Sequence, residues 1–439
     1  MEFVKGFMET PQAVQLNDKR IIRGWAFFDW ANSAYALVIT AAIFPAYFLQ
    51  VTQSELSIGH QSISNSSMYA YAISIAYLCI AFLNPLLSGI ADYSGRRKRF
   101  LKFFTYLGST SCIMLFFFQG MDQLWWGTIF FIIATIGFAG ALVFYNAYLP
   151  VIASEDRYDD VSAQGFAYGY IGSVLLLMVN LLMIIKPEWF GLPEGSLAPR
   201  ISFVMVGLWW LGFSQITFRR LPVDQPSGQI GQLLQHGFRQ IRDVWKRLRH
   251  QKYIKRFLFA FFCYSAGVQT VLYMAATFAE KELQFGSQDL IIIILILQLV
   301  AIGGAYLFAF MSDRVGNKLA LSTMLLLWIS ICIVAYFVQE KVQFYAVAAA
   351  VGMVMGGIQS LSRSTYSKMI DDNEGDLNSY FSFYDVLEKI AIVLGTFSFG
   401  FVEQMTGGMR NSVLVLALYF IIGLIILSRV DIKRFVAKS

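Results

Sequence analysis

The sequence predicts an all-α integral membrane protein with twelve spanning helices arranged as two six-helix repeats. Its composition, the spacing of its apolar runs and the placement of its Lys and Arg residues predict this class. Of the 439 residues, 57% are hydrophobic and 14% are charged, whereas a soluble domain carries about 25% charged residues. The chain therefore lacks the charge to cover a soluble surface, and it is too hydrophobic for a disordered protein.

Apolar runs long enough to cross a bilayer recur along the whole chain. About 30 Å of hydrocarbon requires roughly 20 mostly apolar residues in a helix. The runs do not alternate in polarity as the strands of a membrane β-barrel do, which excludes a barrel. The expected spans are 22–50, 68–91, 100–119, 125–149, 163–185, 201–218, 255–279, 289–311, 319–338, 342–362, 378–402 and 411–428.

The basic residues predict the orientation of the spans. With both termini in the cytoplasm, most of the 34 Lys and Arg residues fall in cytoplasmic segments, as the positive-inside rule requires. Those expected in outer loops are Lys186, Arg200, Lys281, Lys341 and Arg410. The net charge of +6 is thus a signal of topology, and no nucleic-acid partner is needed to explain it. The short loops favour a bacterial inner membrane.

The chain divides into two halves around a basic segment. We expect an N-terminal bundle at 1–218, a cytoplasmic amphipathic linker at 219–254 and a C-terminal bundle at 255–439. The four cysteines lie inside apolar runs, so they form no disulfide framework. No nucleophile with a base, metal cluster or Walker lysine is recognisable at membrane depth. We therefore expect no enzyme activity and no cofactor.

A short motif is repeated in the two halves, between the second and third spans of each. Its first copy contains Asp92, Gly95, Arg96 and Arg97, and its second contains Asp313, Arg314 and Gly316. A parallel repeat of this kind is typical of alternating-access transporters. We expect the acidic residues to hold a gate that breaks and re-forms. The alternative is that the basic residues only anchor lipid headgroups.

These segments resemble a known family. Residues 88–97 and 309–318 are similar to the G-x-L-A-D-R-x-G-R-R signature of the major facilitator superfamily, although Ser88 and Ala309 replace the first Gly and Tyr93 replaces a basic residue. The run GWAFFDWANSAY at 24–35 resembles the first helix of the vacuolar amino-acid effluxer branch and its bacterial relatives. Residues 144–150 and 359–364 are similar to the fourth and tenth helices of that branch. The resemblance implies a solute transporter, with amino acids as the substrate class of the fungal members.

One polar face of the first span carries a carboxylate. Asp29, Asn32 and Ser33 are spaced to share a helical face. A charged group inside a membrane is unfavourable unless it is paired, protonated or in contact with water. We expect Asp29 either to bind a substrate ammonium group or coupling proton, or to clamp two helices together.

The eleventh span carries three ionisable residues near mid-membrane. Asp385 and Lys389 have the spacing of an ion pair within one helix. We expect Glu388 and Lys389 to face a central cavity, where they bind a zwitterion or relay protons. The alternative is a structural pair held against the second span or the linker.

Further candidates lie in the fourth, tenth and eleventh spans. Arg363 either anchors a substrate carboxylate or, as we favour, reaches the membrane surface and water. The remaining candidates for the cavity lining are Tyr145, Asn146, Gln359 and Tyr384. Gly165, Gly169 and Gly172 have the spacing of a close helix contact.

We therefore expect a monomeric transporter that exports a small polar solute by alternating access, with amino acids as the expected substrate class. Proton coupling and simple facilitated exit remain open, and membrane lipids are the other expected partners. The 16 Met and 40 Phe residues suggest an alternative, an exporter of drugs or hydrophobic compounds with the same fold. A second alternative is a receptor or assembly factor without transport, for which the basic linker is the docking site.

Overall fold

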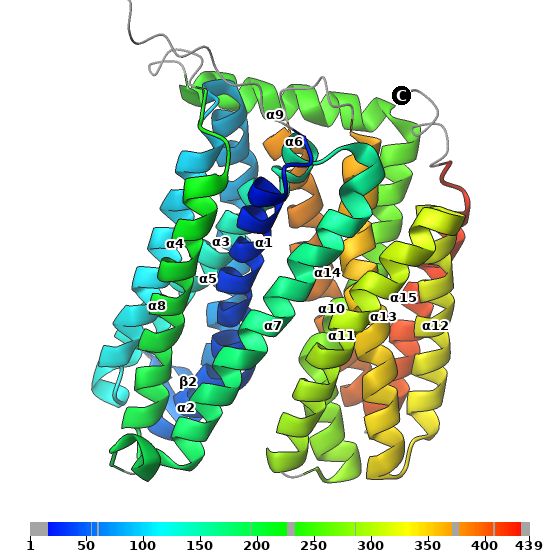
Figure 1. Cartoon of the computed structure of the whole chain (residues 1–439). Helices are drawn as coiled ribbons and strands as arrows, with labels where there is room; N and C mark the ends of the chain where they lie inside the picture. The colour runs from blue at the N-terminus through cyan, green and yellow to red at the C-terminus, as the bar shows by residue number, and fades with distance from the viewer. Residues whose placement is uncertain are drawn as a thin grey trace, which may run out of the picture.

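The computed structural model describes residues 16–53, 55–58, 61–193, 195–225, 233–285, 287–370, 377–406 and 409–431. Two helical bundles lie side by side, and a single helix, α9 (Leu233–His250), crosses one end of both (Figure 1). We call this end of the molecule the α9 end. The N-terminal half precedes α9 in the chain and the C-terminal half follows it.

The N-terminal half begins with a long, interrupted helix. Its parts are α1 (Lys19–Ala34), a π-helical stretch (Tyr35–Ile43) and α2 (Phe44–Val51). The helices that follow are α3 (Asn65–Ser94), α4 (Arg97–Met114), α5 (Leu124–Asn146), α6 (Leu149–Ile152), α7 (Tyr158–Ile185) and α8 (Leu197–Arg220). Short 3-10 turns lie at Leu115–Phe117, Met121–Gln123, Glu155–Arg157 and Pro187–Phe190. Two short antiparallel strands, β1 (Glu55–Ile58) and β2 (Gln61–Ser64), precede α3.

The C-terminal half consists of six long helices. They are α10 (Lys252–Leu283), α11 (Ser287–Val315), α12 (Asn317–Phe337), α13 (Lys341–Met369), α14 (Leu377–Thr406) and α15 (Met409–Ser428). Eleven helical segments in the described residues are long and apolar enough to span a membrane. The twelfth long helix, α14, carries Asp385, Glu388 and Lys389 within five positions, which lowers its hydropathy. The predicted twelve-helix, two-repeat fold is confirmed, and the cytoplasmic position of the termini stays a prediction.

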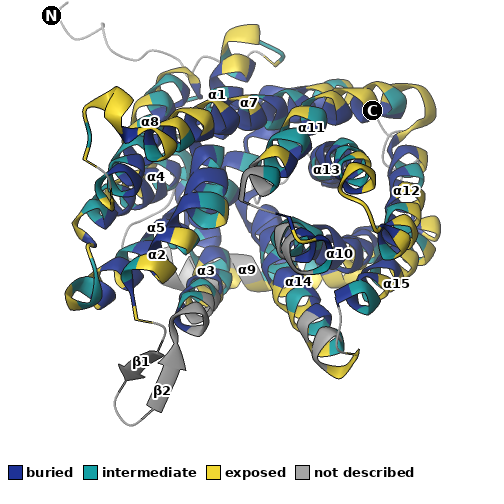
Figure 2. Ribbon diagram, turned by 90° about the horizontal axis from the view of Figure 1, so that it is seen from below, coloured by how far each residue is buried: buried dark blue, intermediate teal, exposed yellow. Residues whose placement is uncertain are grey.

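The two halves contact each other on two sides of the molecule. On one side α7 packs against α11 and α13, and on the other α3 and α5 pack against α14. From the end opposite α9, these helices enclose the middle of the molecule, with α9 crossing behind α3 and α14 (Figure 2). The linker helix packs through the buried residues Val244 and Leu248, and its Trp245 lies 5.6 Å from the ring of Phe383. It packs against α3 of the N-terminal half and against α10 and α14 of the C-terminal half, and so contacts both halves.

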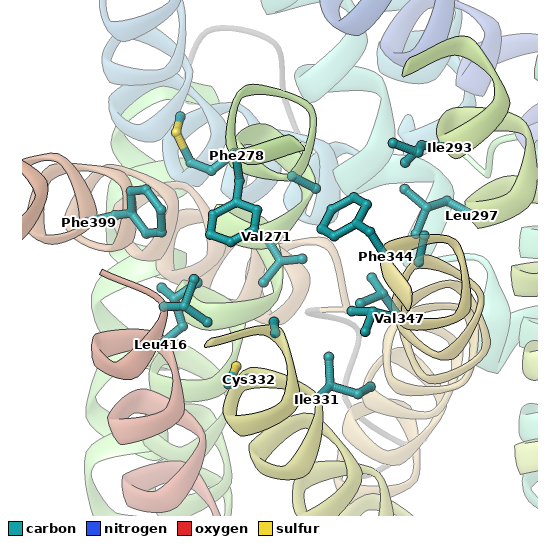
Figure 3. A pocket seen from close by; sticks show the side chains of 16 residues that line it. Val271, Phe278, Ile293, Leu297, Ile331, Cys332, Phe344, Val347, Phe399 and Leu416 are labelled. Atoms are coloured by element: carbon teal, nitrogen blue, oxygen red, sulfur yellow. The ribbon is translucent and has the colours of Figure 1, made fainter. Parts of the chain in front are cut away.

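The cores of the two halves differ toward the end opposite α9. In the N-terminal half, aromatic rings fill the core, as in the stack of Phe44 on Phe131 at 4.5 Å. In the C-terminal half, a cavity remains among all six long helices (Figure 3). Its lining is apolar: Val271, Met274, Ala275, Phe278, Ile293, Leu297, Ile331, Cys332, Ala335, Phe344, Val347, Ala348, Val351, Phe399, Val413 and Leu416. This cavity offers no polar side chain to a polar solute, so the candidate site lies elsewhere.

Candidate substrate and gating site between the two halves

A buried ion pair joins the halves at Asp29 of α1 and Arg363 of α13. The Arg363 Nη1 lies 3.4 Å from the Asp29 Oδ2. Asp29 is 5% exposed and Arg363 is 3% exposed. Tyr145 donates a hydrogen bond of 2.7 Å from its hydroxyl to the same Asp29 oxygen. Arg363 also donates to the Oδ1 of Asn146 at 3.3 Å. The carboxylate is thus held by one cation and one hydroxyl.

The remaining guanidinium donors of Arg363 bind Ser162 of α7. Its Nε donates to the Ser162 Oγ at 2.9 Å, and its Nη2 donates to the Ser162 carbonyl at 2.7 Å. The Ser162 hydroxyl in turn donates to the carbonyl of Ser360 at 2.8 Å. The favoured prediction that Arg363 reaches the surface and water was therefore wrong. The side chain finds its acceptors across the interface, because α13 continues beyond it to Met369.

Three aromatic rings surround the Arg363 guanidinium. Its central carbon lies 4.8 Å from the ring centroid of Trp25, 5.6 Å from that of Tyr145 and 4.3 Å from that of Phe166. The Trp25 and Tyr145 rings are themselves stacked at 4.5 Å. Cation–π contacts of this kind gain strength where water is excluded. Trp25, Ser162 and Phe166 were not among the predicted site residues, although Ser162 lies one helical turn before Gly165.

Glycine at 165 makes this approach possible. A Cβ atom there would lie 2.8 Å from the Asp29 Oδ2, 2.9 Å from the Arg363 Nη2 and 2.9 Å from the Trp25 ring. At Gly169 it would lie 2.6 Å from the Ser33 Oγ, and at Gly172 it would lie 2.7 Å from a backbone oxygen of α1. The predicted close helix contact of these glycines is confirmed.

The other predicted residues of this region have separate environments. Asn32 is 1% exposed, and neither polar atom of its side-chain amide has a hydrogen-bond partner among the described residues. Gln359 accepts a hydrogen bond of 2.8 Å from the Tyr170 hydroxyl. Tyr384 belongs to an aromatic cluster, 4.0 Å from the ring of Phe261. Only Gln359 among these three has a described hydrogen bond between the halves.

A second charged group lies on α14, closer to mid-membrane. The Lys389 Nζ lies 3.3 Å from the Asp385 Oδ1 and 3.2 Å from the Glu388 Oε2. Asn84 of α3 donates to Asp385 at 3.0 Å, which ties this group to the other half. Gln269 of α10 donates to Glu388 at 3.0 Å. The expected pair within the helix is present, and Glu388 has the most open side chain of the three charged residues, at 23% exposure.

The first copy of the repeated motif connects the halves at the α9 end. The Asp92 carboxylate accepts hydrogen bonds from the backbone N–H groups of Asn378 and Ser379, at 3.1 and 2.8 Å. Backbone N–H groups at the start of a helix have no acceptor within the helix, and the helix dipole there favours a negative charge. Gly95 has a φ of +61° and forms the turn. Arg97 lies 3.9 Å from Asp92, whereas no ion pair among the described residues includes Arg96.

The second copy of the motif differs from the first. Asp313 and Arg314 are exposed, and Arg314 lies over the ring of Phe310 at 4.3 Å. Gly316 again forms the turn, with a φ of +83°. In this structure the predicted gate role of Asp313 is not seen, since no described hydrogen bond or ion pair connects it to the N-terminal half.

Asp159 of α7 supplies the carboxylate in its place. It is 1% exposed and accepts hydrogen bonds from Ser312 at 2.5 Å, Asn317 at 2.8 Å and Lys368 at 2.9 Å. Asp159 was not among the predicted site residues, because its partners lie in the other half and no local sequence pattern connects them. The described hydrogen bonds and ion pairs between the halves thus lie between the α9 end and the middle of the helices. They join the two halves on the α9 side of the molecule.

Comparisons with known proteins place the chain in a family. A family model described as vacuole effluxer Atg22 like matches residues 17–438. An uncharacterized MFS-type transporter of Bacillus subtilis (strain 168), YxiO, is 31% identical over 405 residues, which cover 92% of this chain and 93% of that protein. Autophagy-related protein 22 of Kluyveromyces lactis is 23% identical, over 95% of this chain and 94% of that protein.

Solved structures show the same fold. The transporter FucP in its outward conformation has a TM-score of 0.71 and 15% identity, covering 94% of this chain and 98% of FucP. The human organic anion transporter MFSD10 has a TM-score of 0.71 and 13% identity, covering 94% of this chain and all of MFSD10. The family description and the name of the Bacillus relative are those of transporters, which confirms the expectation that the chain is not an enzyme. The chain belongs to the vacuole effluxer Atg22-like family of the major facilitator superfamily and is a multi-pass membrane protein that transports a small-molecule solute.

Proposed function

We propose that the protein exports amino acids by alternating access across a bacterial cell membrane, with the α9 end in the cytoplasm. The observation that carries this proposal is the pairing of opposite charges at the interface, at Asp29 with Arg363 and at Glu388 with Lys389. The family name, vacuole effluxer, supports export, and the Bacillus relative supports the bacterial membrane. The predicted placement of Lys and Arg supports the orientation.

The group on α14 suits a zwitterionic solute. An amino acid that enters between Glu388 and Lys389 offers its ammonium group to the carboxylate and its carboxylate to the ammonium. Glu388 then pairs with the solute ammonium group and Lys389 with the solute carboxylate, so no buried charge is left alone, which would be strongly unfavourable. Asp385 remains held by Asn84 and balances Lys389 throughout. Glu388 has the most open side chain of the group, and we assign it to contact with the solute ammonium group near mid-membrane.

The contacts at the α9 end act as the gate of the transport cycle. Asp92 with the start of α14, Asp159 with Lys368, and Asp29 with Arg363 all separate when the α9 end opens. These contacts form one closed state, and their loss exposes the charged interface to the cytoplasm. Proton uptake by Asp29 or Glu388 is the proposed means of coupling, because a neutral carboxyl releases its cation.

Transport in proteoliposomes tests the proposal. A labelled amino-acid mixture is supplied with and without an imposed pH gradient. Accumulation above equilibrium only with the gradient supports coupled amino-acid transport, and equilibration without accumulation supports a facilitator. Absence of flux in folded protein would exclude amino acids as the substrate class.

Two variants test the coupling residues, with a matched control. Asp29→Asn and Glu388→Gln each remove one carboxylate from the interface, and at least one is expected to abolish the pH dependence. Glu188→Gln makes the same change at a side chain that is 60% exposed in a loop, and it should transport as the wild type does. If both interface variants keep the pH dependence of the wild type, proton coupling through these residues is wrong.

A further inference from the structure

The described side chains that form hydrogen bonds, an ion pair or cation–π contacts with the Arg363 guanidinium come from the N-terminal half. Trp25 and Asp29 belong to α1, and Tyr145 belongs to α5. Ser162 and Phe166 belong to α7. We call these five residues the Arg363 cage. Only the guanidinium that fills the cage comes from the C-terminal half, at the end of a side chain that is 4% exposed.

The Arg363 cage has the composition of a site for organic cations. A carboxylate supplies the charge, and aromatic faces supply a surface that attracts cations more strongly than it attracts neutral groups. The hydroxyl and carbonyl oxygens of Ser162 accept hydrogen bonds from the cation. The Tyr145 hydroxyl donates to the Asp29 carboxylate and so orients it. In the closed state an arginine tethered to the other half occupies this site.

We propose that the Arg363 cage binds the ammonium group of the exported amino acid when the α9 end is open. This inference rests on the proposed function and assigns a loading site to it. Arg363 is then a tethered competitor: it leaves the cage when the halves separate at the α9 end, and it returns when they close. The same residues thus form a cation site in one state and a latch in the other.

The energetics favour such an exchange. Opening without a ligand removes the cation that neutralises Asp29, and a carboxylate at membrane depth is unfavourable unless it is paired, protonated or in contact with water. A solute ammonium group restores the pairing, so the solute stabilises the open state through its higher affinity for that state. On closing, the tethered guanidinium returns at a high effective concentration. It brings further hydrogen bonds to Ser162 and Asn146, which displace the ammonium group.

Binding of a small cation to a vacated cage tests the proposal. Arg363→Ala in the full-length purified protein removes the tethered cation, and methylammonium and methylguanidinium serve as probes at constant ionic strength. Thermal unfolding is followed against probe concentration. We expect a saturable rise in the unfolding temperature of Arg363→Ala, and an apparent affinity about ten-fold weaker in Arg363→Ala with Asp29→Asn, since the charge-assisted contact is lost.

Two controls make the result specific. The wild type should show no saturable rise in this range, since its cage is filled. Arg157→Ala removes an arginine that pairs with Asp160 at 3.2 Å on the surface, and it should show no rise either. If Arg363→Ala does not fold, Arg363→Ser takes its place.

The outcomes separate this inference from the proposed function. A folded Arg363→Ala protein that shows no saturable response, or an equal response after Asp29→Asn, would overturn the cage as a cation site. That result would leave amino-acid export untouched, because export is tested by flux in the wild type. A saturable response without any amino-acid flux would instead overturn the proposed substrate and keep the cage as a site for another amine.

Discussion

Asp159 of α7 and Lys368 of α13 form an ion pair of 2.9 Å that joins the two halves at the α9 end. The Asp159 side chain is 1% exposed and that of Lys368 is 10% exposed. Asn317 bridges the pair: its amide nitrogen donates to Asp159 and its amide oxygen accepts from Lys368 at 2.9 Å. Under the proposed function this bridged pair is part of the gate, and the repeated sequence motif did not reveal it.

Asp159→Asn is expected to weaken the closed state. It leaves Lys368 with an uncompensated charge in a largely buried place, at a cost of about 2–3 kcal/mol, somewhat below that of a fully buried pair. Spin labels at the exposed positions Arg219 and Arg429 report the opening of the α9 end, in a background with Cys79→Ser. We expect a larger population of long distances in Asp159→Asn.

Asp160→Asn is the matched control for that prediction. Asp160 is adjacent, 54% exposed, and pairs with Arg157 on the surface. Such a surface pair contributes less than about 1 kcal/mol, so the distance distribution should match that of the wild type. Equal shifts of the distance distribution in the two variants would show that the effect comes from losing any negative charge in this region, and not from losing the Asp159–Lys368 pair.

The two copies of the motif should respond differently to the same substitution. Asp92→Asn removes a charge that accepts two backbone hydrogen bonds at the start of α14, and charge-assisted bonds of this kind contribute about 1.5–3 kcal/mol each. Transport should fall by at least about ten-fold, since a loss of 1.4 kcal/mol changes an equilibrium ten-fold. Asp313→Asn changes an exposed side chain and should transport as the wild type does. The initial rate of flux checks this prediction. A similar loss of transport in both variants would instead support a gate role for both copies of the motif.

Gly165→Ala is expected to disrupt the Asp29–Arg363 contact. Its new methyl group would lie within 3 Å of both charged groups, so the pair must move apart. The unfolding temperature and the closed-state population should both fall. Gly212→Ala is the control, because a methyl group there meets nothing within 4 Å, and Ala is favoured over Gly in helices by about 1 kcal/mol. A higher unfolding temperature in Gly165→Ala than in the wild type would contradict the role of Gly165.

Lys389→Met is expected to cost more stability than Asp385→Asn. The first change leaves Asp385 and Glu388 as neighbouring carboxylates without their shared cation. The second keeps the pair of Lys389 with Glu388. Thermal unfolding of the two purified variants checks the order, and combining Glu388→Gln with Lys389→Met should recover part of the loss because the two sites are coupled. If the loss of stability in the double variant equals the sum of the losses in the two single variants, Glu388 and Lys389 are not coupled.

The apolar cavity of the C-terminal half should accept additional volume. Ala348→Val adds two carbon atoms among the apolar side chains that line the cavity, and cavity filling raises stability by about 0.5–2 kcal/mol. Ala391→Val is the control at a buried position that does not line the cavity, where overpacking costs about 1–3 kcal/mol. Unfolding temperatures that fall equally in both variants would show that the cavity cannot be filled in this way.

The sequence by itself determined those features that depend on short distances along the chain. The number and order of the helices follow from runs of about 20 apolar residues, because a membrane helix satisfies its own backbone hydrogen bonds. The pair of Asp385 with Lys389 was predictable because residues four apart share a helix face. The close contact of Gly165, Gly169 and Gly172 followed from the same periodicity.

Only the tertiary structure decided which charges meet across the interface. Arg363 lies 334 positions from its partner Asp29, and no local pattern distinguishes it from an arginine at the membrane surface. Likewise, Asp159 replaces Asp313 because Ser312, Asn317 and Lys368 converge on α7, and Asp313 points to the exterior. The physical reason is the cost of a buried charge: each such group must find a partner, and the packing of the two halves determines which partner is within reach.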